Sequence, residues 1–118
     1  LLNEAARYLG TPYVWGGYSP SGFDCSGFVS YCLVHSGVRN TGRLTAQGLY
    51  NICTPVSQSD AQPGDLIFFT GTYDAGEPVT HIGIYVGNGQ MIHCGHPVQY
   101  TSINSPYWQS HFYGFGRW

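Results

Sequence analysis

The chain has 118 residues and a formal net charge of −2, which fits one compact domain and leaves no room for a second core. All four cationic residues are arginines and only 8% of residues are charged, so no basic patch can neutralise a run of phosphates. We therefore expect no nucleic-acid partner. No apolar stretch approaches the roughly 20 residues that span a bilayer, so we expect no membrane insertion either.

The first half of the chain predicts helices joined by a shaped loop. Apolar residues at helical spacing predict a helix over residues 1–9. Gly10 and Pro12 end it, because glycine suits a helix C-terminus and proline restricts the residue before it. Residues 13–22 combine glycine, proline and aromatic side chains, a composition typical of a loop. A short helix is expected over residues 45–52.

Between these elements, an apolar helical face runs from residue 25 to Gly37 and predicts another helix. Asp24 has a side chain that helix N-termini prefer, so we expect it to cap this helix. Cys25 then lies in the first turn, where the helix dipole favours an anion. The thiolate is the reactive form of cysteine, and the small or polar neighbours leave room for a substrate backbone. Cys25 is therefore the candidate nucleophile.

The second half of the chain predicts an antiparallel sheet. Short apolar or alternating runs are separated by turn-forming residues, and residues 70–78 have the composition of a polar loop. Helices come first and strands later, so we predict an α+β fold with N-terminal helices packed on an antiparallel sheet. One domain is expected to cover residues 1–118. The predicted strands are residues 66–69, 80–86, 90–94 and 112–118.

A thiol nucleophile needs a base, and one predicted hairpin offers two histidines. His81 and Gly83 lie on the face of their strand opposite an apolar face. A three-residue Gly-Asn-Gly turn would pair Val86 with Gln90 and put His93 diagonal to His81, roughly 7–8 Å away between backbones. A two-residue turn would put the two imidazoles on opposite faces. The three-residue turn is thus compatible with a Cys–His–His relay in which His93 orients His81.

Other histidines and a metal site are weaker candidates. His96 follows on the loop that leaves the same strand and stays an alternative third member of the relay. His35 and His111 have no motif around them, and we expect structural or surface roles. The group His93, Cys94 and His96 matches no common zinc spacing, so we expect no metal.

The other three cysteines show no Cys-x-x-Cys spacing. A free cysteine is more often a small buried apolar side chain than a reactive group, and we expect that role for them. A disulfide among them stays open, since proteins that work outside the cell can form such bonds. The three are Cys32, Cys53 and Cys94.

Five runs resemble motifs of the NlpC/P60 family of cell-wall peptidases. They occur in the family's order and cover nearly the whole chain. The resemblance extends to the C-terminal peptidase domain of two-domain wall hydrolases. The runs are Pro-Tyr-Val-Trp-Gly-Gly (12–17), Phe-Asp-Cys-Ser-Gly-Phe-Val (23–29), Pro-Gly-Asp-Leu-Ile-Phe-Phe (63–69), His-Ile-Gly-Ile-Tyr-Val-Gly (81–87) and Met-Ile-His (91–93).

The resemblance implies a papain-like α+β fold and a cysteine endopeptidase that needs no cofactor or metal. The family's usual reaction hydrolyses the bond between D-γ-glutamate and a diamino acid, meso-diaminopimelate or L-Lys, in peptidoglycan stem peptides. By position, Cys25 would be the nucleophile. His81 would be the general base and later the general acid, and His93 would orient it. The resemblance also implies that Tyr13 lies near the oxyanion and that Asp24 and Ser26 receive the N-terminal end of the stem. We expect Trp15 to be a core or loop anchor.

The resemblance further implies an extracellular or cell-wall location. We expect the chain to be a piece of a longer, exported protein with a wall-binding or glycosidase domain, and to be a monomer. Three alternatives remain. A related fold supports an amidase that cuts the sugar–peptide link, or an acyltransferase acting on lipids. The chain could also be a wall-binding module without catalytic activity.

Overall fold

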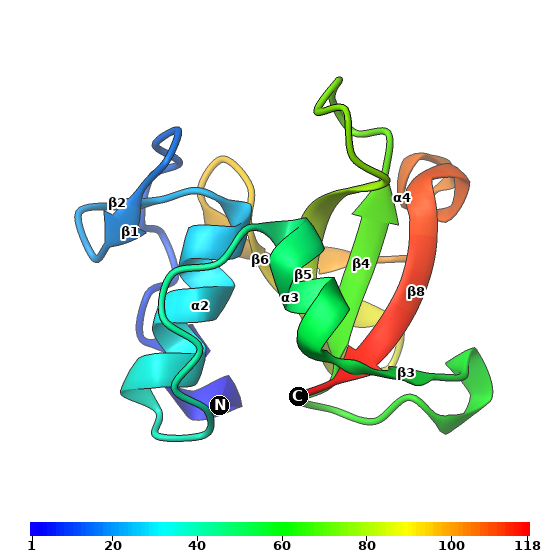
Figure 1. Cartoon of the computed structure of the whole chain (residues 1–118), viewed down its shortest axis with the longest axis horizontal. Helices are drawn as coiled ribbons and strands as arrows, with labels where there is room; N and C mark the ends of the chain where they lie inside the picture. Colours follow the sequence, from blue (N-terminus) through cyan, green and yellow to red (C-terminus); the bar gives the residue numbers. More distant parts are fainter.

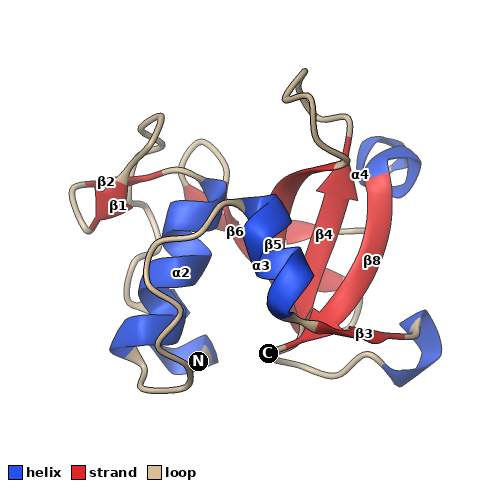
Figure 2. Cartoon of the chain, viewed as in Figure 1, coloured by secondary structure: helices blue, strands red, loops and turns tan.

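One antiparallel sheet organises the computed structural model, which describes all 118 residues (Figures 1 and 2). Its six strands are β3 (Thr54–Val56), β4 (Leu66–Thr70), β5 (Val79–Gly87), β6 (Gln90–Cys94), β7 (Val98–Ser102) and β8 (Phe112–Arg117). The spatial order is β3-β8-β4-β5-β6-β7. The last strand of the chain therefore lies between two earlier ones, and β5 occupies the middle of the sheet.

Helices cover both faces of this sheet. They are α1 (Leu2–Ala6), α2 (Cys25–His35), α3 (Ala46–Ile52) and α4 (Pro106–His111), with a 3-10 turn at Gln58–Asp60. A small ribbon of β1 (Tyr18–Ser19) and β2 (Gly22–Phe23) precedes α2. In Figure 1, α2 and α3 lie on the near side, and both pack against β5. None of the helices combines the length and apolar character that crossing a bilayer requires.

The period-two alternation of the strands divides the core into two layers. The larger layer lies between α2 and the sheet and includes Phe28, Leu33, Phe68, Ile82 and Ile84, all fully buried. The smaller layer lies on the opposite face. It contains Ile67, Phe69, Met91, Ile103 and Phe115, with Trp108 of α4 packed against it. The predicted α+β class is confirmed.

The predicted helices and strands occur with small changes in their bounds. The first helix stops at Ala6 rather than residue 9. The helix that starts at Cys25 is capped as expected, because the Asp24 side chain accepts a hydrogen bond from the Gly27 N–H. Thr45 caps α3 in the same way. Sequence analysis missed β3, β7, α4 and the small ribbon.

The turn of the β5–β6 hairpin differs from the prediction. Gly87, not Val86, pairs with Gln90, and Asn88 and Gly89 form a two-residue turn with φ of +54° and +72°. Such a turn needs positive φ at both positions, which asparagine and glycine adopt most easily. Val86 is an extra residue at an irregularity in β5. That extra residue restores the expected pairing deeper in the hairpin.

The two histidines therefore share a face despite the different turn. Pairing deeper in the hairpin follows the predicted register, which puts His93 across from Gly83 and diagonal to His81. A Cβ on Gly83 would lie 2.8 Å from the Met91 sulfur and 3.1 Å from Cβ of His93. Glycine at this position therefore lets the His93 side chain lie close over β5.

Candidate active site

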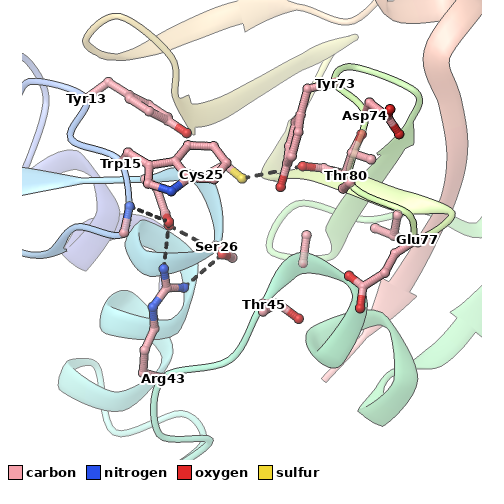
Figure 3. A pocket seen from close by; sticks show the side chains of 15 residues that line it. Tyr13, Trp15, Cys25, Ser26, Arg43, Thr45, Tyr73, Asp74, Glu77 and Thr80 are labelled. Carbon is pink, nitrogen blue, oxygen red and sulfur yellow. Dashed lines mark hydrogen bonds and ion pairs between the residues drawn. The ribbon is translucent and has the colours of Figure 1, made fainter.

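Cys25 is the first residue of α2 and opens onto a cavity of about 490 Å³ (Figure 3). The side chain is largely buried, with 7% of the residue exposed. Its thiol donates a hydrogen bond to the Thr80 carbonyl oxygen, with 3.8 Å between Sγ and oxygen. The structure shows no hydrogen bond from this thiol to the imidazole of His81. The sulfur instead lies against the β5 backbone one residue before His81.

Aromatic and acidic side chains form the rim of this cavity. Tyr13 and Trp15 come from the loop before β1, and Tyr73 comes from the loop between β4 and β5. The rings of Trp15 and Tyr73 meet edge to face, with 5.5 Å between centroids. Trp15 is 72% exposed, so the expectation that it anchors the core or loop is wrong. Asp74 and Glu77 line the wall opposite Arg43.

Asp24 ties three segments together beside the nucleophile. Its Oδ1 accepts from the Gly27 N–H at 2.7 Å and from the Ser26 hydroxyl at 3.3 Å. Its Oδ2 accepts from the Gly16 N–H at 3.1 Å and from Nη2 of Arg43 at 2.7 Å. Four donors therefore occupy the carboxylate, which fixes the aromatic loop to the start of α2.

Arg43 completes this network, and sequence analysis did not identify it. Its Nη1 donates to the Ser26 hydroxyl and to the Leu44 carbonyl, both at 2.8 Å. Because the guanidinium also forms an ion pair with Asp24, it contacts both residues that the resemblance expects to bind the stem peptide, Asp24 and Ser26. The residue lies in an irregular segment between α2 and α3, where no periodic pattern marks it.

His81 and His93 form a hydrogen-bonded pair, as the hairpin argument predicts. Nε2 of His81 lies 2.9 Å from Nδ1 of His93, and the two rings are nearly perpendicular, at 84°. Nε2 of His93 lies 2.9 Å from the Thr101 hydroxyl on β7. The result is a chain of three polar groups across β5, β6 and β7.

Trp108 covers the histidine pair. Its ring stacks on His81 with 5.2 Å between centroids and meets His93 edge to face at 5.3 Å. Burial and, to a smaller extent, the neighbouring His93 together lower the pKa of His81 to about 3. Burial likewise lowers the pKa of His93 to about 4. Both rings are therefore neutral near pH 7 in the substrate-free protein.

The thiol of Cys25 is also neutral in this state. Burial and the charge of Asp24 raise its pKa to about 11. The backbone N–H groups of Ser26 and Ile82 lower the pKa, as a helix N-terminus should, but burial outweighs them. The structure therefore describes a resting thiol, with donors already in position for the anion.

Tyr13 lines the same cavity as Cys25 and is half-buried. Burial and the charges of Cys25 and Asp24 raise its pKa to about 12, so its hydroxyl keeps the proton that a hydrogen-bond donor needs. Its ring packs against His96, with 5.5 Å between centroids. His96 therefore packs against Tyr13, whereas His93 holds the position next to His81.

The remaining histidines and cysteines have structural surroundings. His35 stacks on Tyr31, and His111 bonds the Thr70 carbonyl at 2.7 Å. All four cysteines are free, so the disulfide left open above is not formed. The thiol of Cys94 donates to a backbone carbonyl at 3.2 Å. No group of three or more metal-binding side chains converges anywhere in the chain.

The fold and the site together define an α+β domain in which a cysteine at a capped helix N-terminus lines an open cavity. Its sulfur lies against the strand that carries one member of a hydrogen-bonded histidine pair. The sequence profile described as the NlpC/P60 family matches residues 10–117. The chain belongs to the NlpC/P60 family.

Curated relatives and solved structures agree with this assignment. The bifunctional muramidase/DL-endopeptidase CwlT of Bacillus subtilis is 44% identical over 119 residues, covering 99% of this chain and 35% of that protein. The probable endopeptidase p60 of Listeria seeligeri is 47% identical over 118 residues, covering 99% of this chain and 21% of that protein. A crystal structure of an NLP/P60-family, lipoprotein-like protein from Staphylococcus aureus has a TM-score of 0.93 and 43% identity, covering 98% of this chain and 39% of that one. The fold expected from the resemblance is confirmed, and the chain spans about a fifth to a third of the curated relatives it matches.

Proposed function

We propose that this chain is a cysteine endopeptidase domain that hydrolyses peptidoglycan stem peptides between D-γ-glutamate and a diamino acid. The contact between Cys25 and the Thr80 carbonyl carries the proposal, because it sets the thiol against β5 one residue from His81. The open cavity beside Cys25 gives a peptide access to the sulfur. The names of the relatives, a DL-endopeptidase and a probable endopeptidase, support the reaction class.

The reaction starts with transfer of the thiol proton from Cys25 to Nδ1 of His81. This is the only ring nitrogen available, because Nε2 of His81 is bonded to His93. The thiolate then attacks the γ-amide carbonyl and forms a C–S bond. The Cys25 N–H and the Tyr13 hydroxyl hold the oxyanion, an interaction whose loss typically costs about 10²–10³ in rate.

Collapse of this intermediate breaks the C–N bond. His81 gives its proton to the leaving amine, and the acyl group stays on sulfur as a thioester. Water then attacks the thioester with His81 as base and releases the carboxylic acid and the thiol. His93 keeps the His81 ring oriented throughout, the task that a carboxylate performs in other triads.

The cavity's charges suit a substrate that carries an ammonium group. Arg43 neutralises Asp24 on one wall. Asp74 and Glu77 on the other wall have no ion-pair partner in the protein. A diamino acid on the leaving side of the cut bond brings the amine of its side chain to that acidic wall. Asp24 and Ser26 line the cavity beside Cys25 and would receive the N-terminal end of the stem.

The same proposal covers the setting of the domain. Its substrate is located in the cell wall, so the domain acts outside the membrane, as a monomer. The relatives are three to five times longer than the part that matches, which fits a protein with additional wall-binding or glycosidase domains.

Digestion of purified peptidoglycan, with fragments identified by mass spectrometry, tests the proposal. We expect new termini between D-γ-glutamate and the diamino acid, and no cleavage by Cys25→Ala. Cys53→Ala is the matched control, because Cys53 lies at the end of α3 and away from the cavity, and should digest normally. Release of intact stem peptides from the glycan would indicate an amidase instead. Binding of wall fragments without any cleavage would indicate an inactive binding module.

A further inference from the structure

Thr101 makes the outermost contact of the histidine pair. It lies on β7 across from Met91 of β6, and its hydroxyl is 2.9 Å from Nε2 of His93. We propose that Thr101 is a positioning residue that sets the tautomers of His93 and His81 and thereby keeps Nδ1 of His81 free to act as a base. The inference rests on the proposed function for its catalytic consequence, but the tautomers can be measured without any reaction.

The hydrogen-bond chain admits only two proton arrangements, because each neutral imidazole carries one N–H and one lone pair. In the first, His81 carries its proton on Nε2 and donates it to Nδ1 of His93. His93 must then carry its own proton on Nε2 and donate it to the Thr101 hydroxyl. This arrangement leaves a lone pair on Nδ1 of His81, which is the state that a general base requires.

The second arrangement reverses both hydrogen bonds. Thr101 donates to Nε2 of His93, and Nδ1 of His93 donates to Nε2 of His81. His81 then carries its proton on Nδ1, and its only lone pair is already bonded to His93. A His81 ring in this state cannot take the thiol proton. Catalysis therefore requires Thr101 to act as the acceptor.

Thr101 is the only residue outside the pair that is hydrogen-bonded to either imidazole. Gln99, which lies across from His93 on β7, donates its amide N–H to the Pro97 carbonyl instead. The elements around the pair present Phe69 from β4 and Trp108 from α4, and neither accepts a proton. The titratable groups of α2 and α4 include Cys25 and His111, and none of these groups is hydrogen-bonded to either imidazole. The former bonds Thr80 and the latter bonds Thr70, so both are engaged elsewhere. No carboxylate is bonded to either imidazole.

Removal of the hydroxyl should reverse the tautomers. In Thr101→Val, a proton on Nε2 of His93 would be a buried donor without an acceptor, which is the costlier kind of unpaired group. The proton therefore moves to Nδ1 of His93, and His81 moves its own proton to Nδ1. The base is blocked although both rings stay in position. Thr101→Ser retains the hydroxyl and should keep the first arrangement.

Two measurements test the inference. Long-range ¹H–¹⁵N NMR distinguishes protonated from unprotonated ring nitrogens, and we expect Nε2 protonated in both histidines of the wild type and of Thr101→Ser. Thr101→Val should show Nδ1 protonated in both. Its kcat on a stem peptide should fall about 10- to 100-fold, the loss typical of removing a hydrogen-bond partner that orients a metal-binding histidine, with KM unchanged.

The outcomes separate this inference from the proposed function. A wild type with Nδ1 of His93 protonated overturns the inference, even if the protein cleaves stem peptides and even if Thr101→Val does not fold. A Thr101→Val variant with wild-type tautomers and wild-type kcat overturns it as well. The predicted tautomers in a protein that cleaves no stem peptide would refute the proposed function alone.

Discussion

Replacement of Arg43 by alanine should weaken both the fold and the substrate site. The change removes charge-assisted hydrogen bonds to Asp24 and to Ser26, at 2.7 and 2.8 Å. Such bonds contribute about 1.5–3 kcal/mol each where they are buried. Here the side chains of Arg43 and Asp24 are 30% and 14% exposed, and Asp24 keeps two backbone donors. Because of this solvent screening, we expect the free energy of unfolding to fall by about 2 kcal/mol in total, less than two buried bonds of this kind would contribute.

Arg39→Ala is the matched control for this prediction. It removes the same charge from the same interhelix segment, but the Arg39 side chain makes only one hydrogen bond, at 3.3 Å, to the Ile52 carbonyl. Its effect on the free energy of unfolding should stay within about 0.5 kcal/mol.

Thermal unfolding and steady-state kinetics provide the readouts. For a domain of this size, Arg43→Ala should lower Tm by about 5–10 °C, and Arg39→Ala by no more than about 2 °C. Only Arg43→Ala should raise KM, because only Arg43 holds Asp24 and Ser26 in the cavity wall. Equal Tm and KM values for the two variants would refute the reasoning that Arg43 organises this wall.

Three further predictions concern the thiol, the histidine pair and the acidic wall. Because the pKa of Cys25 is raised to about 11, only about one thiol in 10⁴ is ionised at pH 7. Its alkylation by iodoacetamide, followed by peptide mass spectrometry, should speed up about tenfold per pH unit from pH 7 to 9; a rate already constant below pH 7 would show a preformed ion pair. Trp108→Ala should admit water to His81 and raise its lowered pKa, so the acid limb of the kcat/KM profile should move to higher pH, whereas Trp108→Phe should move it less; an unmoved limb in Trp108→Ala would contradict this. Asp74→Asn with Glu77→Gln should raise KM for stem peptides whose diamino acid carries a free amine, and leave KM unchanged when that amine is acetylated; an equal effect on both would remove the acidic wall from recognition.

Local patterns predicted the elements that carry the chemistry. The cap at Asp24 and the apolar helical face that follows it are encoded within a dozen consecutive residues, and the structure contains both. The same holds for the strands that bear His81 and His93. The turn between them was predicted wrongly, since it has two residues and a neighbouring irregularity at Val86. The shorter turn and the extra residue each shift the side-chain alternation by one position, and the two shifts cancel. The histidines therefore share a face as predicted, but for a different reason.

Residues brought in by tertiary packing could not be predicted in this way. Arg43, Tyr73 and Thr101 reach the site from a coil, a loop and an outer strand, and nothing in their local sequence indicates their partners. Trp108 is a different case. Ser105 followed by Pro106 is a recognisable start of a helix, and the structure shows Ser105 as the N-cap of α4. The Ser-Pro pair therefore indicates α4, although it does not indicate that Trp108 covers the His81 ring.

The central claim is that the sulfur of Cys25 becomes covalently attached to the acyl part of the substrate. Rapid acid quench of the enzyme with a defined stem peptide, followed by intact-protein and peptide mass spectrometry, tests it most directly. We expect an adduct on Cys25 with the mass of the fragment that ends in D-γ-glutamate, and no adduct in Cys25→Ala. Turnover by Cys25→Ala at the wild-type rate, or an adduct on any other residue, would contradict it.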